Sequence, residues 1–341
     1  MMFRLLNRFL WDQDEQRLRA FWRVCLHTLL VLLLTGIPLV LWTLGTVVFG
    51  AHSGANTVGL FSVSNLTQQV GSPGLLLLSI ANFFGILGST LIAGCWIDRR
   101  KFTQFGFSFT KRWWVDFAFG LGLGAGLMGL IFLIGWLTGS LRVTGFYITG
   151  RQGTGFIPGL MKGLALFTLV GIYEELLFRG YYLVNLAEGI NYRGLGKRTA
   201  VWWAYGLSSL TFGLLHLGNL NATWVGAINT ALAGVFLGLG MLLTGSLAIP
   251  IGTHIAWNFF QGYVFGFAVS GFQADTTLIG TEILGNTWLM GGRFGPESGA
   301  LSLVAMLIGS LLMVLWVRRN GQLEVHADLA EYTPRPEPNR A

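Results

Sequence analysis

The chain has 341 residues, of which 53% are hydrophobic and only 11% are charged. A soluble globular domain carries about 25% charged residues, so water is not the main solvent of this chain. The net charge of +7 comes from short basic clusters at the ends of apolar runs. Orientation in a membrane explains such clusters, and we therefore exclude nucleic acid as a partner. The two cysteines, Cys25 and Cys95, have neither metal-ligand spacing nor a disulfide framework around them.

Eight apolar runs are long enough to cross a hydrocarbon core of roughly 30 Å, which takes about 20 helical residues. We therefore expect an all-α fold, a polytopic membrane helix bundle with about eight transmembrane helices. The 49 glycines fit such a bundle, because small residues let helix backbones approach closely. The predicted spans are 24–49, 74–97, 114–138, 157–182, 200–217, 224–243, 247–269 and 299–317.

The basic residues predict the orientation of the bundle. Seventeen of the 22 Lys and Arg residues fall in the two terminal segments or in the loops that share their side, and four fall in the opposite loops or, for Lys162, near the start of the span that follows. The remaining one, Arg179, lies inside a predicted span. By the positive-inside rule, both termini are expected in the cytoplasm. Residues 2–11 are either a short amphipathic helix on the cytoplasmic surface or a frayed basic leader, and the polar tail from Glu324 is expected to be disordered.

Three charged side chains, Glu174, Glu175 and Arg179, lie close together within the predicted span 157–182, where each costs about 2.5–3.5 kcal/mol and is a functional candidate. Glu175 and Arg179 are spaced i,i+4 and are expected to form an ion pair. Glu174 points about 100° away around the helix, so it is left without this partner and suits a general base. The alternative is a purely structural ion pair beside a protonated second glutamate.

Two further spans carry polar residues in apolar surroundings. His216 ends the stretch Phe212–His216, and His254 and Asn258 stand one helical turn apart, so that both can face one cavity. A single buried histidine is more often structural than catalytic. Two histidines, an asparagine and a double glutamate on three helices together predict a site that activates water.

These residues form the patterns EExxxR, FxxxH and HxxxN in successive spans, and they resemble the CAAX protease and bacteriocin-processing family, which includes type II CAAX prenyl proteases. The resemblance covers about residues 115–270. It implies an intramembrane endopeptidase that cuts membrane-associated peptides, in some members just before the last three residues of a prenylated protein. Glu174 and His216 would activate the attacking water, while His254 and Asn258 would steady the oxyanion. The candidate catalytic residues are Glu174, Glu175, Arg179, His216, His254 and Asn258.

We expect no cofactor, although zinc held by Glu174, His216 and His254 is an alternative, since these match the ligand number of a catalytic zinc site. The chain lacks the HExxH pair of many zinc peptidases. Two other functions stay open: a non-catalytic membrane scaffold or immunity-type protein of the same family, and a transporter with a Glu/His proton relay. The expected partners are the lipid bilayer and a membrane-associated peptide or protein substrate.

The chain is expected to divide into four parts. The first holds the surface helix and two transmembrane helices, and the second is the CAAX protease-like catalytic core. An extracytoplasmic loop with the last transmembrane helix follows, and then a disordered cytoplasmic tail. Their expected bounds are 1–113, 114–270, 271–317 and 318–341.

Overall fold

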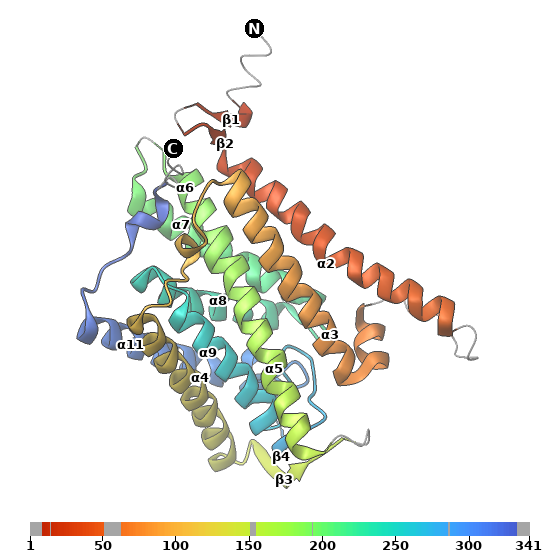
Figure 1. Ribbon diagram of the computed structural model, residues 1–341. Helices are drawn as coiled ribbons and strands as arrows, with labels where there is room; N and C mark the ends of the chain where they lie inside the picture. The colour runs from red at the N-terminus through yellow and green to blue at the C-terminus, as the bar shows by residue number, and fades with distance from the viewer. Residues whose placement is uncertain are drawn as a thin grey trace.

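The computed structural model describes residues 9–13, 15–50, 63–150, 155–192, 194–285 and 287–332. Residues 2–8 of the predicted surface helix over residues 2–11 lie outside these ranges. The described part is mainly helical, with β1, β2 and α6 at one end and β3 and β4 at the other (Figure 1). We call these the terminal end and the hairpin end; the second name refers only to the paired strands β3 and β4, which are distant in sequence.

The helices follow one another along the chain with short irregular turns between most of them. The α-helices are α2 (Ala20–Gly50), α3 (Val63–Ile92), α4 (Lys111–Leu137), α5 (Phe156–Glu175), α6 (Leu183–Ile190), α7 (Lys197–Leu215), α8 (Trp224–Thr244), α9 (Ala248–Phe259), α10 (Thr287–Met290) and α11 (Ala300–Asn320). Three turns are π-helical: η2 (Ala93–Ile97), η4 (Leu176–Tyr182) and η6 (Phe260–Val264). Four are 3₁₀-helical: η3 (Phe102–Phe105), η5 (His216–Gly218), η7 (Pro296–Ser298) and η8 (Ala327–Ala330).

Six helices of the described part are long and apolar enough to cross a membrane, which confirms the all-α polytopic membrane bundle. The number of eight is not confirmed. The helices α7 and α9 lie at the remaining two predicted spans, but α7 carries Ser208, Ser209 and Thr211, and α9 has only 12 residues before its π-turn. The six spans are Ala20–Leu41, Leu75–Ile97, Lys111–Leu137, Phe156–Ile190, Trp224–Thr244 and Ala300–Asn320.

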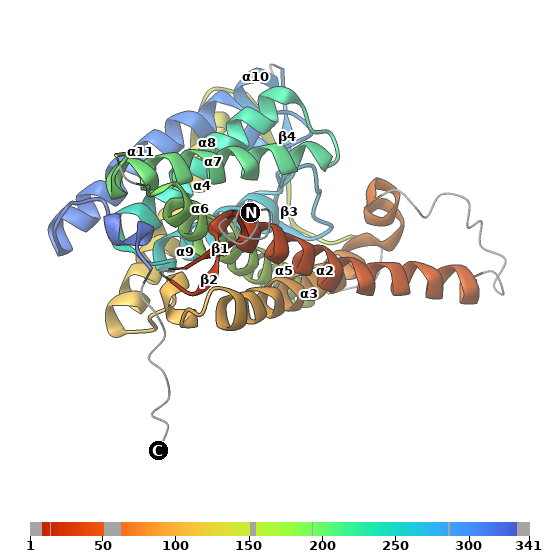
Figure 2. The ribbon, with the colours of Figure 1, turned by 90° about the horizontal axis from the view of Figure 1, so that it is seen from above.

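Helix α9 occupies the middle of the bundle, where it contacts α4, α5 and α8. Helices α2, α3 and α5 lie to one side of it and α7, α8 and α11 to the other, as the view from above shows (Figure 2). The contact with α4 is backbone to backbone. A Cβ atom added at Gly124 of α4 would lie 2.3 Å from the carbonyl oxygen of Thr253, and one at Gly252 of α9 would lie 2.3 Å from that of Phe117. Glycine at these positions therefore allows the backbones of α4 and α9 to approach each other this closely.

Two small antiparallel sheets were not anticipated from the sequence. The strands β1 (Trp11–Asp12) and β2 (Arg17–Leu18) pair at the terminal end. At the hairpin end, β3 (Leu141–Ile148) pairs with β4 (Thr277–Ile283), with an irregularity between Val143 and Gly145. The second pairing ties the segment after α4 to the segment before α11.

A buried cluster of charges closes the terminal end. The carboxylate of Glu188 on α6 accepts hydrogen bonds from Arg17, Arg23 and Arg100, all three of which are nearly inaccessible to solvent. The guanidinium of Arg17 stacks 3.3 Å from the ring centroid of Tyr332. Four segments distant in sequence are thereby joined at one place.

The chain after α11 packs onto this end, which differs from the disordered tail expected from Glu324 onward. The backbone N–H of His326 donates to the carbonyl of Leu242 at 3.0 Å, and Leu329 and Ala330 in η8 are buried. These apolar residues follow several polar ones, so composition averaged over the tail concealed them. Residues 333–341 lie outside the described part of the chain.

Candidate active site

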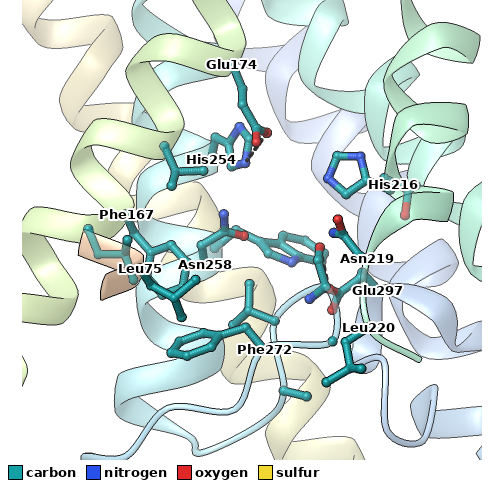
Figure 3. A pocket seen from close by; sticks show the side chains of 18 of the residues that line it. Leu75, Phe167, Glu174, His216, Asn219, Leu220, His254, Asn258, Phe272 and Glu297 are labelled. Carbon is teal, nitrogen blue, oxygen red and sulfur yellow. Dashed lines mark hydrogen bonds and ion pairs between the residues drawn. The ribbon is translucent and has the colours of Figure 1, made fainter. Parts of the chain in front are cut away.

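A cavity of about 840 Å³ lies inside the bundle. Its walls come from α3, α5, α7, α8 and α9 and from the loops at the hairpin end, and they are mainly apolar. Figure 3 shows Glu174 and His254 beside each other at one end of this cavity, with His216 facing them from the opposite wall. Four of the predicted site residues line the cavity: Glu174, His216, His254 and Asn258.

The adjacent glutamates end α5 and point in different directions. The side chain of Glu174 is 19% exposed, toward the cavity, whereas that of Glu175 is 0% exposed. Directly after them the helix changes from α-helical to π-helical geometry in η4. Such π-turns occur frequently at functional sites. The separation that helical geometry predicted for the two carboxylates is therefore present, with Glu174 at the cavity and Glu175 behind it.

Glu175 joins two other predicted residues behind the cavity wall. Its Oε1 atom accepts a hydrogen bond from Nη1 of Arg179 at 3.0 Å and another from Nδ1 of His254 at 2.8 Å. The Nη2 atom of Arg179 donates to the carbonyl of Gly234 on α8 at 3.1 Å. Glu175 and Arg179 are not among the residues that line the cavity, so their contacts connect α5, α8 and α9 without facing a ligand.

The bond to Glu175 determines which nitrogen of His254 faces the cavity. A carboxylate only accepts, so Nδ1 carries the proton and Nε2 is the nitrogen turned toward Glu174. The distance from Nε2 to Oε2 of Glu174 is 3.7 Å, which is too long for a direct hydrogen bond. The two atoms are near enough that a single water could contact both.

His216 begins the 3₁₀ turn η5 directly after α7. Its Nδ1 atom donates to the carbonyl oxygen of Phe212 at 2.7 Å, which leaves Nε2 without that proton and available as an acceptor. The Phe212 ring lies 4.6 Å from the His216 ring and 4.4 Å from the guanidinium of Arg179. The phenylalanine of FxxxH therefore orients the histidine through its backbone and packs beside the buried ion pair through its ring.

Asn258 stands one turn after His254 on α9 and is partly buried against the same cavity. In Figure 3 it lies below His254, on the side away from Glu174. The π-turn η6 begins two residues later. Helix α9 thus presents one ring nitrogen and one side-chain amide to the cavity from a single face.

Sequence reasoning missed Glu297, which is buried and also lines the cavity. Its carboxylate accepts hydrogen bonds from the backbone N–H of Ser270, from Oγ of Ser270 at 3.0 Å and from Nε2 of Gln261. Burial raises the pKa of Glu297 to about 7. Because this residue follows Pro296 in a segment between predicted spans, where acids are common, no sequence signal distinguished it.

No group of three or more His, Cys, Asp or Glu side chains in the described ranges is arranged to hold a metal ion. Of the three residues considered for zinc, Glu174 and His254 lie close together, and His216 faces them with its Nδ1 occupied by a backbone carbonyl. The metal-free mechanism and the zinc alternative both stay predictions that a metal analysis tests.

Residues 156–260 match the family model described as Type II CAAX prenyl endopeptidase Rce1-like. All three motifs fall inside this range, so the match confirms the resemblance inferred from them. The flanking helices α2, α3, α4 and α11 lie outside it. No curated protein and no solved structure matches the chain.

Proposed function

We propose that this CAAX protease-like membrane protein is an intramembrane endopeptidase that cleaves membrane-associated proteins or peptides with a water activated by Glu174 and His216. One observation carries the proposal: Oε2 of Glu174 and Nε2 of His254 lie 3.7 Å apart at one end of an apolar cavity that His216 and Asn258 also line. The carboxylate of Glu174 as base, Nε2 of His216 as a second acceptor and the amide of Asn258 as donor thus surround a space that can hold a water and a peptide carbonyl.

The reaction follows from the roles these groups can take. Glu174, assisted by His216, accepts a proton from water as the water oxygen bonds to the scissile carbonyl carbon. The carbonyl oxygen becomes an oxyanion, which the side-chain amide of Asn258 and a protonated His254 stabilise by donating hydrogen bonds. Glu174 then returns the proton to the amide nitrogen as the C–N bond breaks. The products are a carboxylic acid and an amine.

Glu175 and Arg179 support these groups in the proposed mechanism. Glu175 accepts the hydrogen bond from Nδ1–H of His254, which keeps Nε2 turned toward the cavity. Arg179 balances the charge of Glu175 and anchors it to α8. Both residues belong to the site, although neither contacts substrate in this scheme.

We further propose that both termini face the cytoplasm and that residues 114–270 form the catalytic core. The proposed orientation is supported by where basic residues lie on the helices. Lys111 and Arg112 begin α4, Lys197 begins α7, and Arg318 and Arg319 end α11, all at the terminal end. Basic residues concentrate on the cytoplasmic side of membrane proteins.

The test is cleavage of a panel of lipidated and unlipidated peptides by the purified protein. Glu174→Gln should lower the rate of cleavage by about 10²–10⁴-fold while the folded protein is still recovered. Glu282→Gln is the matched control, because Glu282 is exposed on β4 and pairs only with exposed Arg142 among the described residues. Equal activity of wild type and Glu174→Gln would refute the assignment, and absence of cleavage by every preparation would favour the non-catalytic scaffold.

A further inference from the structure

The cavity extends from the candidate catalytic residues in one direction only. On α5 its lining runs from Glu174 back to Leu166, and on α8 it runs from Leu237 back to Thr230. Both helices begin at the hairpin end, so these stretches lie on that side of the site. On α7, which runs the opposite way, the lining begins at Phe212, near the end of the helix.

The opposite direction is filled with buried side chains. Past Glu174 the chain continues through Leu176, Phe178, Arg179 and Tyr181, each at most 4% exposed. Leu176, Phe178 and Tyr181 pack with residues of α7, α8 and α9 in the largest buried hydrophobic cluster. Within the described ranges, no residue of α5 or η4 beyond Glu174 lines the cavity. The cavity therefore does not continue past Glu174 toward the terminal end.

The exposed residues of the cavity lining all lie in η5 or in loops at the hairpin end, so these segments form the cavity mouth. Leu220 follows α7, Phe272 lies between η6 and β4, and Arg293 precedes α11. The backbone N–H of Gly271 donates to the carbonyl of Phe294 at 2.7 Å, which joins two of these loops directly. Figure 3 shows Leu220 and Phe272 on the side of the cavity away from Glu174.

From this geometry we propose that substrates enter the cavity from the extracytoplasmic side and are apolar peptide segments of proteins exposed on that surface. The inference rests on the proposed peptidase function and on the cytoplasmic location of the termini. The basic residues that support this location lie at the end of α4, α7 and α11 that is remote from the mouth. Cytosolic prenylated proteins would approach from the closed end of the bundle.

The chemistry of the walls indicates what such a segment contains. Between the mouth and Glu174 the cavity is lined by Leu166, Phe167, Val170 and Val269, which favour apolar side chains next to the scissile bond. Arg293 is exposed at the mouth, and Asp275, which pairs with Lys162, lines the same end of the cavity, so the mouth carries charges of both signs. The substrate class is therefore an extended, mainly apolar peptide of an exported or membrane-anchored protein.

Cysteine labelling tests which side of the membrane holds the mouth. After Cys25 and Cys95 are replaced by alanine, Gln273→Cys marks the mouth, and Asn320→Cys at the end of α11 marks the terminal end. In intact cells, a membrane-impermeant maleimide should label Gln273→Cys, and it should label Asn320→Cys only after permeabilisation. Glu282→Cys on β4 provides a second marker of the hairpin end if Gln273→Cys fails to fold. The reverse labelling pattern would overturn the inference whether or not the protein is active.

Sealed vesicles test substrate access with a quenched fluorescent peptide of apolar residues. Right-side-out vesicles should cleave external peptide at least about tenfold faster than inverted vesicles, and Glu174→Gln should lower the rate of cleavage in both by about 10²–10⁴-fold. Faster cleavage by inverted vesicles would overturn the inference while supporting the peptidase. Absence of Glu174-dependent cleavage in either orientation and in detergent would refute the peptidase function and the substrate class with it, even if labelling places the mouth outside.

Discussion

The Nδ1 atom of His254 lies 2.8 Å from Oε1 of Glu175, the same oxygen that accepts a hydrogen bond from Arg179. The two adjacent glutamates consequently have different surroundings: Glu174 faces the cavity, and Glu175 is held between a histidine and an arginine. Glu174 is thus the candidate base, and Glu175 is the residue that supports the neighbouring His254.

Substitution of each glutamate by glutamine should separate these roles. We expect Glu174→Gln to lower kcat by about 10²–10⁴-fold with little change in thermal stability, because general base catalysis contributes that much. Glu175→Gln should lower both kcat and the unfolding temperature, because His254 and Arg179 lose a buried charge partner. Peptide-cleavage kinetics and thermal unfolding in detergent measure the two effects. Identical profiles for the two variants would contradict separate roles.

Arg179→Ala should reduce the free energy of unfolding by about 3–5 kcal/mol, because it leaves the Glu175 carboxylate buried without its cation. Arg142→Ala is the matched control, since its pair with Glu282 is exposed and should contribute about 0–1 kcal/mol. Denaturation in mild detergent, followed by tryptophan fluorescence, provides the comparison. An Arg179→Ala protein of normal stability without activity would instead place Arg179 in contact with substrate.

Gly124→Ala should displace α9 and with it His254 and Asn258, because the added Cβ would lie 2.3 Å from the Thr253 carbonyl oxygen. We expect a lower unfolding temperature and a lower kcat. Gly122→Ala on the same helix is the control, since its Cβ meets no atom within 4 Å and alanine favours a helix by up to about 1 kcal/mol. Equal behaviour of the two variants would show that this close contact does not position the site.

The parts of the site that the sequence predicted are those set by local geometry. The pair Glu175–Arg179 and the shared face of His254 and Asn258 follow from i,i+4 spacing within one helix. The bond between Glu175 and His254 joins residues 79 positions apart, and no local periodicity encodes such a contact. The motifs predicted a common site, but they did not indicate that Glu175 rather than Glu174 holds Nδ1 of His254.

The fold shows the same division between local and distant interactions. Apolar runs predicted the helices, because burial in lipid depends on composition over about 20 residues. The pairing of β3 with β4 brings together segments 129 or more residues apart, and neither segment is apolar enough to stand out in a membrane protein. The packing of Leu329 and Ala330 against the terminal end also depends on distant partners.

Stability should depend on pH through Glu297. Burial raises the pKa of this carboxyl from 4.5 to about 7 in the folded protein, so the folded state binds its proton more tightly than the unfolded state. The stability that the protonated Glu297 carboxyl contributes is therefore fully present below about pH 4.5 and is lost as pH rises through about 7. The unfolding temperature of wild type should fall across this window relative to Glu297→Gln, which cannot ionise. Parallel curves for the two proteins would contradict this.

Metal removal should leave activity unchanged if Glu174 acts as the base in the proposed way. We expect prolonged dialysis against a chelator to have little effect and elemental analysis to find far less than one zinc per chain. A zinc enzyme would lose activity and recover it when metal is added, because bound zinc supplies the hydroxide. Stoichiometric zinc in wild type that disappears in His216→Ala and His254→Ala would establish the alternative.

The contact between Arg17 and Tyr332 has a consequence for biosynthesis. Arg17 emerges from the ribosome before the first membrane helix, whereas Tyr332 emerges only after α11 has been made. Throughout insertion of the intervening helices, the arginines around Glu188 lack the segment that covers them in the finished protein. Closure of this end must therefore follow translation of all the helices, and a chain released before residue 332 would leave buried guanidinium groups open to water.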